Sequence, residues 1–301
     1  MQYNRNFSEI YNSIYENSKN NRDLFFGMNE TRAALTEGFG HPGFVDLKYG
    51  EIISGNIIVL FMDIRGFTKI SVALENEELI RILQATTIAS IYSVRKFGGY
   101  IIDLTGDGIM AYFGDGIRTN KNDALNSIKT ASFLMDGVKN TVNKHLDKNN
   151  DETIRIGIGL EYGKALWTLI GTEDTSQAKP ISEVTYIAGK NSSHAKSWEV
   201  IMGKNISDWV PEVFKDNYEP YKFHKDGKEY EYKRYSLKWQ EINTQLISNS
   251  MKFEYSLLQK NLPILDSVTQ SNLGNISTNS NNTKTNGPRP LKDQPFFFEG
   301  A

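Results

Sequence analysis

Six consecutive apolar residues, Ile57 to Met62, run without alternation into the acidic residue Asp63. A strand with one face in water alternates apolar and polar side chains, so an unbroken apolar run indicates a strand that is covered on both faces. Gly66 follows within a few residues and precedes a segment that is expected to be helical. The chain is therefore expected to build a sheet with other elements packed against both of its faces.

The segments that follow alternate between helix and strand patterns. A helix is predicted from Asn76 to Lys96, where apolar residues recur on one helical face until Gly98-Gly99 ends it. Tyr100 to Phe113 indicate two strands joined by a tight Gly-Asp-Gly turn, and Asp123 to His145 a second amphipathic helix.

Two further hairpins are predicted in the second half of the chain. Ile154 to Leu160 alternate with glycine and charged residues, which indicates a strand. This strand is expected to turn at Tyr162-Gly163 into a partner strand, Ala165 to Ile170. A hairpin rich in Tyr and Lys is predicted around Asp226-Gly227. The predicted elements follow the order βα, β-hairpin, α, β-hairpin, α, β. This order predicts an α+β fold, in which a ferredoxin-like sheet carries additional strands and is flanked by helices.

Composition changes along the chain predict four parts. Residues 1–50 form a helical N-terminal extension, in which four apolar side chains from Ile10 to Tyr15 have helical spacing. A globular core covers 51–240 and a C-terminal helix 241–262. Residues 263–301 are rich in Asn, Ser and Thr and are expected to be disordered, because they bury too little apolar surface to offset their ordering entropy.

The overall composition excludes several classes of function. A formal charge of −2 gives no general attraction to nucleic acid or acidic lipid. The absence of cysteine excludes disulfides, thiolate catalysis and cysteine-based zinc sites. The first residues lack the apolar region of a signal peptide, and the longest apolar run is far shorter than the roughly 20 residues that span a bilayer. We therefore expect a cytoplasmic protein without nucleic-acid or membrane partners.

Two aspartates are the strongest candidates for chemistry. Asp63 ends the buried strand, and Asp107 lies between two glycines at the tip of a predicted hairpin. If the two strands are neighbours, their carboxylates meet at one edge and can hold two metal ions about 4 Å apart. The backbone amides of Gly66, Phe67 and Thr68 could hold phosphate oxygens at the start of the next helix. The structural alternative is that Asp63 caps a helix and Asp107 forms a turn.

Three ordered motifs resemble the class III nucleotide cyclase catalytic domain. Phe61 to Thr68 match Phe-x-Asp-Ile-x-Gly-Phe-Thr, Gly98 to Gly114 match a Gly-Gly segment with a Gly-Asp hairpin tip, and Arg155 to Gly171 match a third motif. The resemblance covers about residues 55–200 and assigns the 51–240 core to this family.

This resemblance implies a two-metal reaction. Asp63, Asp107 and the carbonyl of Ile64 would bind two Mg²⁺ or Mn²⁺ ions, and the ribose 3′-oxygen would attack the α-phosphorus and release pyrophosphate. Family members build each site between two chains, so a head-to-tail homodimer is implied.

The base is read in this family at two positions. The first corresponds to Asp103, whose carboxylate cannot satisfy the acceptor N1 of adenine, so ATP is disfavoured. The second corresponds to Tyr186. This phenol, or Tyr49 before the first strand, could shrink the pocket below purine size, although ordinary packing of either tyrosine is the simpler interpretation.

Such departures resemble the pyrimidine cyclases of the Pycsar anti-phage system, which make cyclic UMP or cyclic CMP to activate a separate effector protein. UTP is favoured over CTP, because cytosine would place its unprotonated N3 near the carboxylate of Asp103. The alternatives are a cytidylate cyclase, a guanylate cyclase and a non-catalytic nucleotide-binding protein. A diguanylate cyclase is disfavoured because its Gly-Gly-(Asp/Glu)-Glu-Phe turn is absent.

One family motif is not conserved in register. The Asn-x-Ala-x-Arg residues that stabilise the transition state correspond to Ser193, Ala195 and Ser197. Asn191 and Lys196 are the predicted substitutes, with His194, Arg65 and Arg95 as further possibilities. A solvated helix face is the simpler interpretation of Lys196.

Overall fold

The computed structural model describes residues 7–20, 44, 46–148, 153–172, 175–225 and 227–247. The predicted tail 263–301, and the part of the predicted helix 241–262 beyond residue 247, lie outside these residues. No helix within the described ranges is long and apolar enough to cross a membrane.

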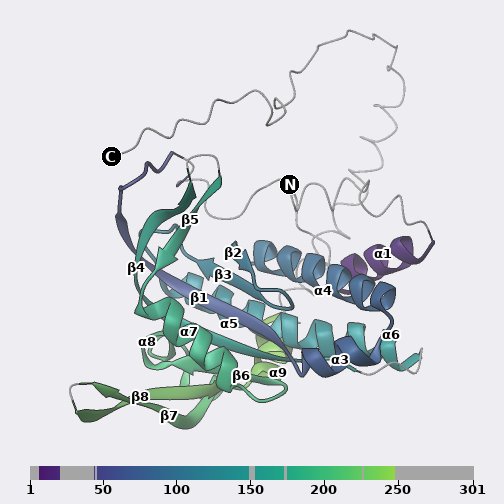
Figure 1. The fold of residues 1–301 in the computed structure, drawn as a ribbon. Helices are drawn as coiled ribbons and strands as arrows, with labels where there is room; N and C mark the ends of the chain where they lie inside the picture. Colours follow the sequence, from purple (N-terminus) through teal and green to yellow (C-terminus); the bar gives the residue numbers. More distant parts are fainter. Residues whose placement is uncertain are drawn as a thin grey trace, which may run out of the picture. The chain divides into compact units, whose positions relative to one another are not determined.

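One mixed sheet organises the described chain (Figure 1), in the strand order β2-β3-β1-β4-β6-β8-β7, with β5 paired to β4. The strands are β1 (Ile53–Arg65), β2 (Tyr100–Leu104), β3 (Ile109–Phe113), β4 (Arg155–Thr172), β5 (Thr175–Ile181), β6 (Glu199–Gly203), β7 (Lys215–Lys225) and β8 (Lys228–Leu237). The segment β2-β3-β1-β4 is the ferredoxin-like sheet, which confirms the predicted fold class, and β5 to β8 are the additions.

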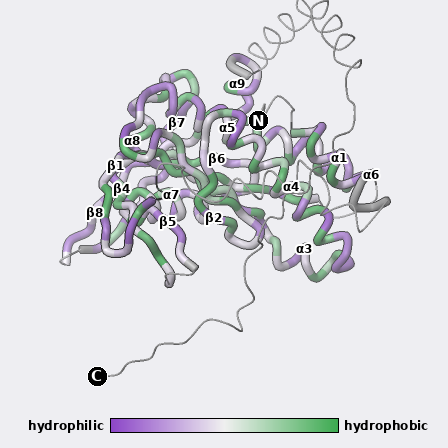
Figure 2. The backbone as a smooth tube through the Cα atoms, turned by 90° about the horizontal axis from the view of Figure 1, so that it is seen from above, coloured by the Kyte–Doolittle hydropathy of each residue, from purple (hydrophilic) through white to green (hydrophobic). Residues whose placement is uncertain are grey.

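Helices lie on both faces of this sheet. They are α1 (Phe7–Asn20), α3 (Phe67–Ala73), α4 (Asn76–Lys96), α5 (Lys121–Gly137), α6 (Asn143–Lys148), α7 (Glu183–His194), α8 (Lys204–Ser207) and α9 (Trp239–Ile242). Short helical turns occupy Val138–Val142, Glu212–Phe214 and Asn243–Ile247. Hydrophobic and hydrophilic residues alternate along α4, as expected of an amphipathic helix that covers a sheet (Figure 2).

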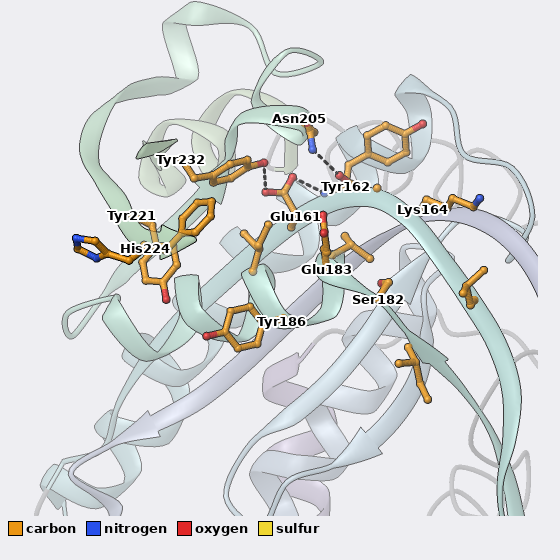
Figure 3. Close-up of a pocket in the computed structure, with 16 residues that line it drawn as sticks. Glu161, Tyr162, Lys164, Ser182, Glu183, Tyr186, Asn205, Tyr221, His224 and Tyr232 are labelled. Atoms are coloured by element: carbon orange, nitrogen blue, oxygen red, sulfur yellow. Dashed lines mark hydrogen bonds between the residues drawn. The ribbon is translucent and has the colours of Figure 1, made fainter. Parts of the chain in front are cut away.

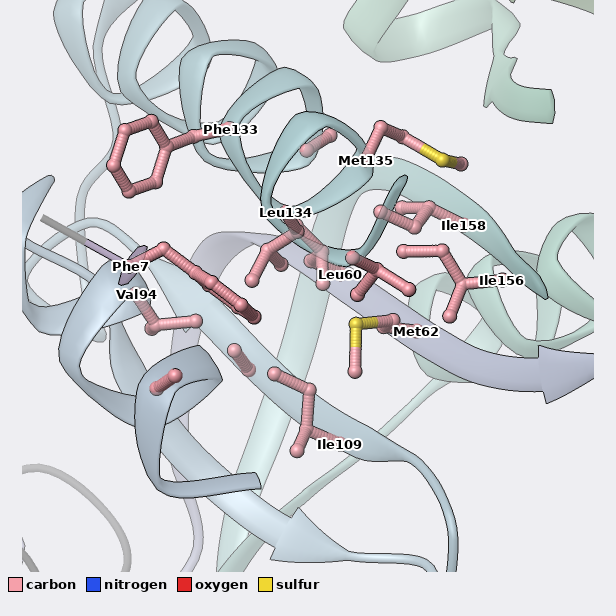
Figure 4. Close-up of a cluster of buried hydrophobic side chains, with 14 of the residues drawn as sticks. Phe7, Leu60, Met62, Val94, Ile109, Phe133, Leu134, Met135, Ile156 and Ile158 are labelled. Atoms are coloured by element: carbon pink, nitrogen blue, oxygen red, sulfur yellow. The ribbon is translucent and has the colours of Figure 1, made fainter. Parts of the chain in front are cut away.

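The apolar run of β1 is buried on both faces, as predicted. Leu60 and Met62 belong to the core beneath α4 and α5 (Figure 4). Ile57 and Val59 belong to a second core, which includes Trp167 and residues of α7. Alternate side chains of one strand therefore fill two separate cores.

The N-terminal helix is part of the first core. Phe7, Tyr11 and Tyr15 on α1 are buried, and α1 packs against α4. The residues predicted to share one helical face do so. The helix α1 therefore completes the same hydrophobic core as the central strands of the sheet.

One predicted turn is wrong. The chain does not reverse at Tyr162-Gly163, because β4 continues unbroken and pairs with β1 from Arg65↔Arg155 to Ile53↔Trp167. The hairpin forms later, between β4 and β5, with Thr172 opposite Thr175. Gly163 marks a contact with α7, since a Cβ there would lie 3.4 Å from the Cβ of Val184. A glycine inside a strand often marks such a close approach.

Candidate active site

Strand pairing brings the two predicted aspartates together. β1 and β3 are antiparallel neighbours with Met62 opposite Ile109, so the turn that carries Asp107 lies beside Asp63. A Cβ on Gly108 would lie 2.4 Å from the carbonyl oxygen of Met62 and 3.4 Å from the Cα of Asp63. Glycine at position 108 therefore allows the turn to approach the end of β1 this closely.

The two carboxylates influence each other. Burial raises the pKa of Asp107, and repulsion by the charge of Asp63 raises it further. Backbone N–H groups of Asp107 and Ile64 and the charge of Arg65 oppose this rise in the pKa. Two neighbouring carboxylates that resist joint ionisation are stabilised by a bound cation.

The oxygen ligands at this edge of the sheet suit a hard divalent metal ion. The N–H of Ile64 points to the carboxylate of Asp107. In an antiparallel strand the N–H and C=O of one residue point to the same side, so the Ile64 carbonyl also faces Asp107, beyond the last pair with β3. The described residues contain no group of three or more His, Cys, Asp or Glu side chains placed to hold a metal ion. Two carboxylates and a carbonyl fit Mg²⁺ or Mn²⁺, which commonly completes its shell with water and substrate phosphates.

Arg65 connects this site to α7. Its Nη1 lies 3.0 Å from Oδ2 of Asp63, and its Nη2 donates to the carbonyl of Ser192 at the end of α7. The Nε of Arg65 is buried and has no hydrogen-bond partner. Gly157 provides the space, because a Cβ there would overlap the guanidinium. Arg65 is therefore the cation at the aspartate pair.

The start of α3 lies next to the metal residues. Gly66 has φ 70°, a left-handed conformation that turns the chain directly from β1 into the helix. The N–H groups of Lys69 and Ile70 bond to the Gly66 carbonyl. The preceding amides, those of Phe67 and Thr68, belong to the first turn and have no partner within the helix. Their predicted contact with phosphate stays a prediction.

The base-reading candidate Asp103 is paired with a lysine that the sequence did not reveal. Nζ of Lys179 on β5 lies 2.5 Å from Oδ2 of Asp103, and the N–H of Leu104 donates to Oδ1 at 3.0 Å. Asp103 and Lys179 lie far apart in the sequence, so local patterns could not predict their contact. The one indication was general: a partly buried carboxylate is stabilised by a nearby positive charge.

The two candidate tyrosines lie elsewhere. Tyr186 on α7 is 57% exposed and lines a cavity of about 790 Å³ between α7, β4 and the β7–β8 hairpin (Figure 3). Tyr49 is 46% exposed and precedes β1, whereas Asp63 is at the other end of that strand, roughly 30 Å away at the usual rise per residue. The residues that line the cavity at Tyr186 do not include Asp63 or Asp107.

The predicted transition-state residues lie at the C-terminal end of α7, the helix end to which Arg65 bonds. Asn191 on α7 is 1% exposed, and its Nδ2 donates to the carbonyl of Leu160 at 3.2 Å. Its Oδ1 is buried without a hydrogen-bond partner. Lys196 is exposed, follows the end of α7, and its backbone N–H donates to Glu199. The catalytic role of both residues stays a prediction.

Glu161 on β4 is a buried carboxyl group in the wall of the cavity (Figure 3). Burial raises its pKa to about 7, despite hydrogen bonds from the Tyr232 hydroxyl and the Tyr162 N–H. A carboxyl group whose pKa is higher in the folded state binds more protons there than in the unfolded chain. The folded state is therefore destabilised as the pH rises from the unfolded pKa through about 7.

Glu161→Gln is expected to remove most of this pH dependence. Up to about 3 kcal/mol of the stability lost between pH 4.5 and 7 should disappear in the variant. Urea unfolding at several pH values would measure this, with the exposed neighbour Glu183→Gln as the control. Equal pH profiles for wild type and Glu161→Gln would show that Glu161 titrates normally.

Comparison with known proteins agrees with this geometry. Residues 52–237 match the family model described as the adenylate and guanylate cyclase catalytic domain. A cytidylate cyclase from Staphylococcus aureus is 27% identical over 184 residues, which cover 58% of this chain and 42% of that protein. A cytidylate cyclase from Escherichia coli is 25% identical over 195 residues, or 62% of this chain and 42% of that protein. The chain thus aligns with less than half of the length of these relatives.

A solved structure supports the fold. The adenylyl cyclase CyaB from P. aeruginosa matches with a TM-score of 0.56 at 21% identity and covers 62% of this chain and 95% of that one. At this identity the match concerns the fold alone. Residues 52–237, which match the family model, include the aspartate pair, the start of α3 and α7.

Proposed function

The chain belongs to the adenylate and guanylate cyclase catalytic domain family, and from this we propose that it converts a pyrimidine nucleoside triphosphate into the 3′,5′-cyclic monophosphate and pyrophosphate. The observation that carries the proposal is the carboxylate pair of Asp63 and Asp107 at the end of β1, next to the start of α3. A triphosphate needs such a combination of metal ligands and free amides.

The chemistry assigned to this edge is direct phosphoryl transfer. Asp63, Asp107 and the Ile64 carbonyl would hold two Mg²⁺ or Mn²⁺ ions. Bound there, the ions would lower the pKa of the ribose 3′-hydroxyl and offset the phosphate charge. The 3′-hydroxyl loses its proton to solvent, and its oxygen forms a bond to the α-phosphorus. The bond from the α-phosphorus to the bridging oxygen breaks and pyrophosphate leaves with that oxygen. The amides of Phe67 and Thr68 hold phosphate oxygens.

The cation that stabilises the transition state is proposed to be Arg65 or Lys196. Arg65 already lies at Asp63, and its buried Nε has a free hydrogen-bonding site. Lys196 is exposed beyond the end of α7 and is proposed to act on the site of a second chain. Asn191 is proposed to act from α7 in the same way, which requires it to leave its bond to Leu160.

The names of two relatives favour CTP over UTP as the proposed substrate. UTP was favoured from the sequence because a lone acidic group at position 103 suits the N3–H of uracil. Two relatives of this chain are cytidylate cyclases. CTP is therefore the proposed substrate, with UTP as the alternative that Asp103 alone would favour.

A head-to-tail homodimer is proposed to complete each site. Tyr186 lines a cavity that does not include the aspartate pair, so Tyr186, and with it Lys196, is proposed to serve the site of the partner. The β4–β5 hairpin carries large apolar side chains that are exposed in the single chain and suit such an interface: Leu166, Ile170 and Ile181.

The product is proposed to be a signal. A cyclic pyrimidine nucleotide made in the cytosol would act on a separate effector protein with a cyclic-nucleotide-binding site, as part of anti-phage defence. The support is the resemblance to pyrimidine cyclases noted from the sequence. Cells that carry this chain and its effector should resist phage, and cells with Asp63→Ala should not.

Product identification tests the proposed activity. The purified protein is incubated with ATP, GTP, CTP and UTP separately in Mn²⁺, and the products are identified by mass spectrometry. Cyclic CMP as the main product supports the proposal, and cyclic UMP supports the pyrimidine class alone. Cyclic GMP or cyclic AMP as the main product would overturn it. Nucleotide binding without any cyclic product would indicate a non-catalytic member of the family.

A further inference from the structure

The β4–β5 hairpin reaches across to β2 through two side chains. β5 pairs with β4 in the sheet, yet Lys179 contacts Asp103 and Gln177 Nε2 donates to the carbonyl of Ile102 at 2.6 Å. Ala178, between them, packs on the second core. Successive side chains of a strand point to opposite sides. The contacts of Gln177 and Ala178 therefore fix the side to which Lys179 points.

The Asp103–Lys179 pair offers solvent a hydrogen-bond acceptor beside a hydrogen-bond donor. The side chains of Lys179 and Asp103 are 33% and 39% exposed, so each keeps part of its surface available to a ligand. The carboxylate can only accept, and the ammonium can only donate. A ligand edge with a donor beside an acceptor matches the pair.

Cytosine has such an edge, with an amino group at C4 next to an unprotonated N3. A lone carboxylate would accept from the amino group but repel N3, and this repulsion was the reason to favour UTP. The ammonium of Lys179, 2.5 Å from the carboxylate, removes that repulsion and supplies the missing donor.

We propose that Lys179 is a second base-reading residue, which donates to N3 of cytosine while Asp103 accepts from the C4 amino group. This inference rests on the proposed cyclase activity and names the residue that selects its substrate. Uracil presents the opposite order, a donor N3–H beside the acceptor O4, so it can meet the same pair only if its ring shifts to place N3–H at Asp103 and O4 at Lys179.

The test compares Lys179→Met with Lys238→Met. Lys238 forms a 3.0 Å ion pair with Asp216 and has the same side-chain exposure of 33%, so it controls for the loss of a lysine ion pair. Each variant is given equal CTP and UTP in Mn²⁺, and the ratio of cyclic CMP to cyclic UMP is measured. Lys179→Met should lower this ratio by about 10-fold or more, because a base contact contributes discrimination of that order. Lys238→Met should leave it unchanged, and Lys179→Arg should largely restore it.

The outcomes separate this inference from the proposed activity. An equal fall in both products with Lys179→Met would give Lys179 a structural role and overturn the inference while the cyclase proposal stands. Cyclic UMP as the main wild-type product would also overturn it. If no variant makes a cyclic product, the cyclase proposal fails, and the ratio of CTP to UTP dissociation constants, measured by calorimetry for wild type and Lys179→Met, decides the inference. Lys179→Gln serves the same comparison if the Met variant does not fold.

Discussion

Asp63→Asn and Asp107→Asn should each lower cyclic nucleotide formation by about 10³-fold or more, while the protein remains folded. Each change removes one of the two carboxylates that face the same edge of β1. Without both, the charge that develops on the phosphates and on the 3′-oxygen is not offset, and interactions that act only in the transition state are worth factors of this size. Initial rates with CTP in Mn²⁺ measure the effect.

A stability measurement separates lost catalysis from lost structure. Burial and the charge of Asp63 raise the pKa of Asp107, so its ionised form is unfavourable in the fold. Asp107→Asn should therefore melt no lower than wild type. Asp147→Asn, an exposed aspartate on α6, is the matched control and should affect neither rate nor stability. Full activity in Asp63→Asn or Asp107→Asn would refute the metal assignment.

Gly159→Ala is expected to be the most destabilising single-methyl addition near the site. A Cβ at this position of β4 would lie 2.1 Å from the backbone N of Ser192 and 2.2 Å from the carbonyl oxygen of Ala188. Both atoms belong to α7, so the whole helix would have to shift, at a cost of about 2–3 kcal/mol. The urea midpoint should fall accordingly.

Gly163→Ala is the matched control on the same strand. Its Cβ would lie 3.4 Å from the Cβ of Val184, which is about an ordinary van der Waals contact. Its stability should stay within about 1 kcal/mol of wild type. Equal effects of Gly159→Ala and Gly163→Ala would contradict the closer approach of the α7 backbone to Gly159.

Local sequence patterns predicted those parts of the site that lie within a single segment of the chain. The unbroken apolar run of β1 indicated a strand between two cores, and the Gly-Asp-Gly turn placed Asp107 at a hairpin tip. Both features depend on neighbours in the sequence. The meeting of Asp63 and Asp107 needed only the additional condition that β1 and β3 be adjacent.

Features that depend on distant contacts were not predictable. Gly163 was interpreted as a turn, because its contact with α7 is visible only after α7 folds onto β4. Lys179 was missed, because its approach to Asp103 depends on how the β4–β5 hairpin curves toward β2. The burial of Asn191 likewise depends on the orientation of α7 above Leu160.

The long ladder between β1 and β4 also has a kinetic consequence. Ile53 pairs with Trp167 and Arg65 with Arg155, so the centre of the sheet joins segments that emerge from the ribosome well apart in time. Closing so large a loop costs chain entropy before the contacts between β1 and β4 can form, and this slows folding. Until β4 arrives, β1, with its run of six apolar residues, has an unpaired edge. A nascent chain stalled between β3 and β4 should therefore be the species most prone to aggregation and most dependent on chaperones.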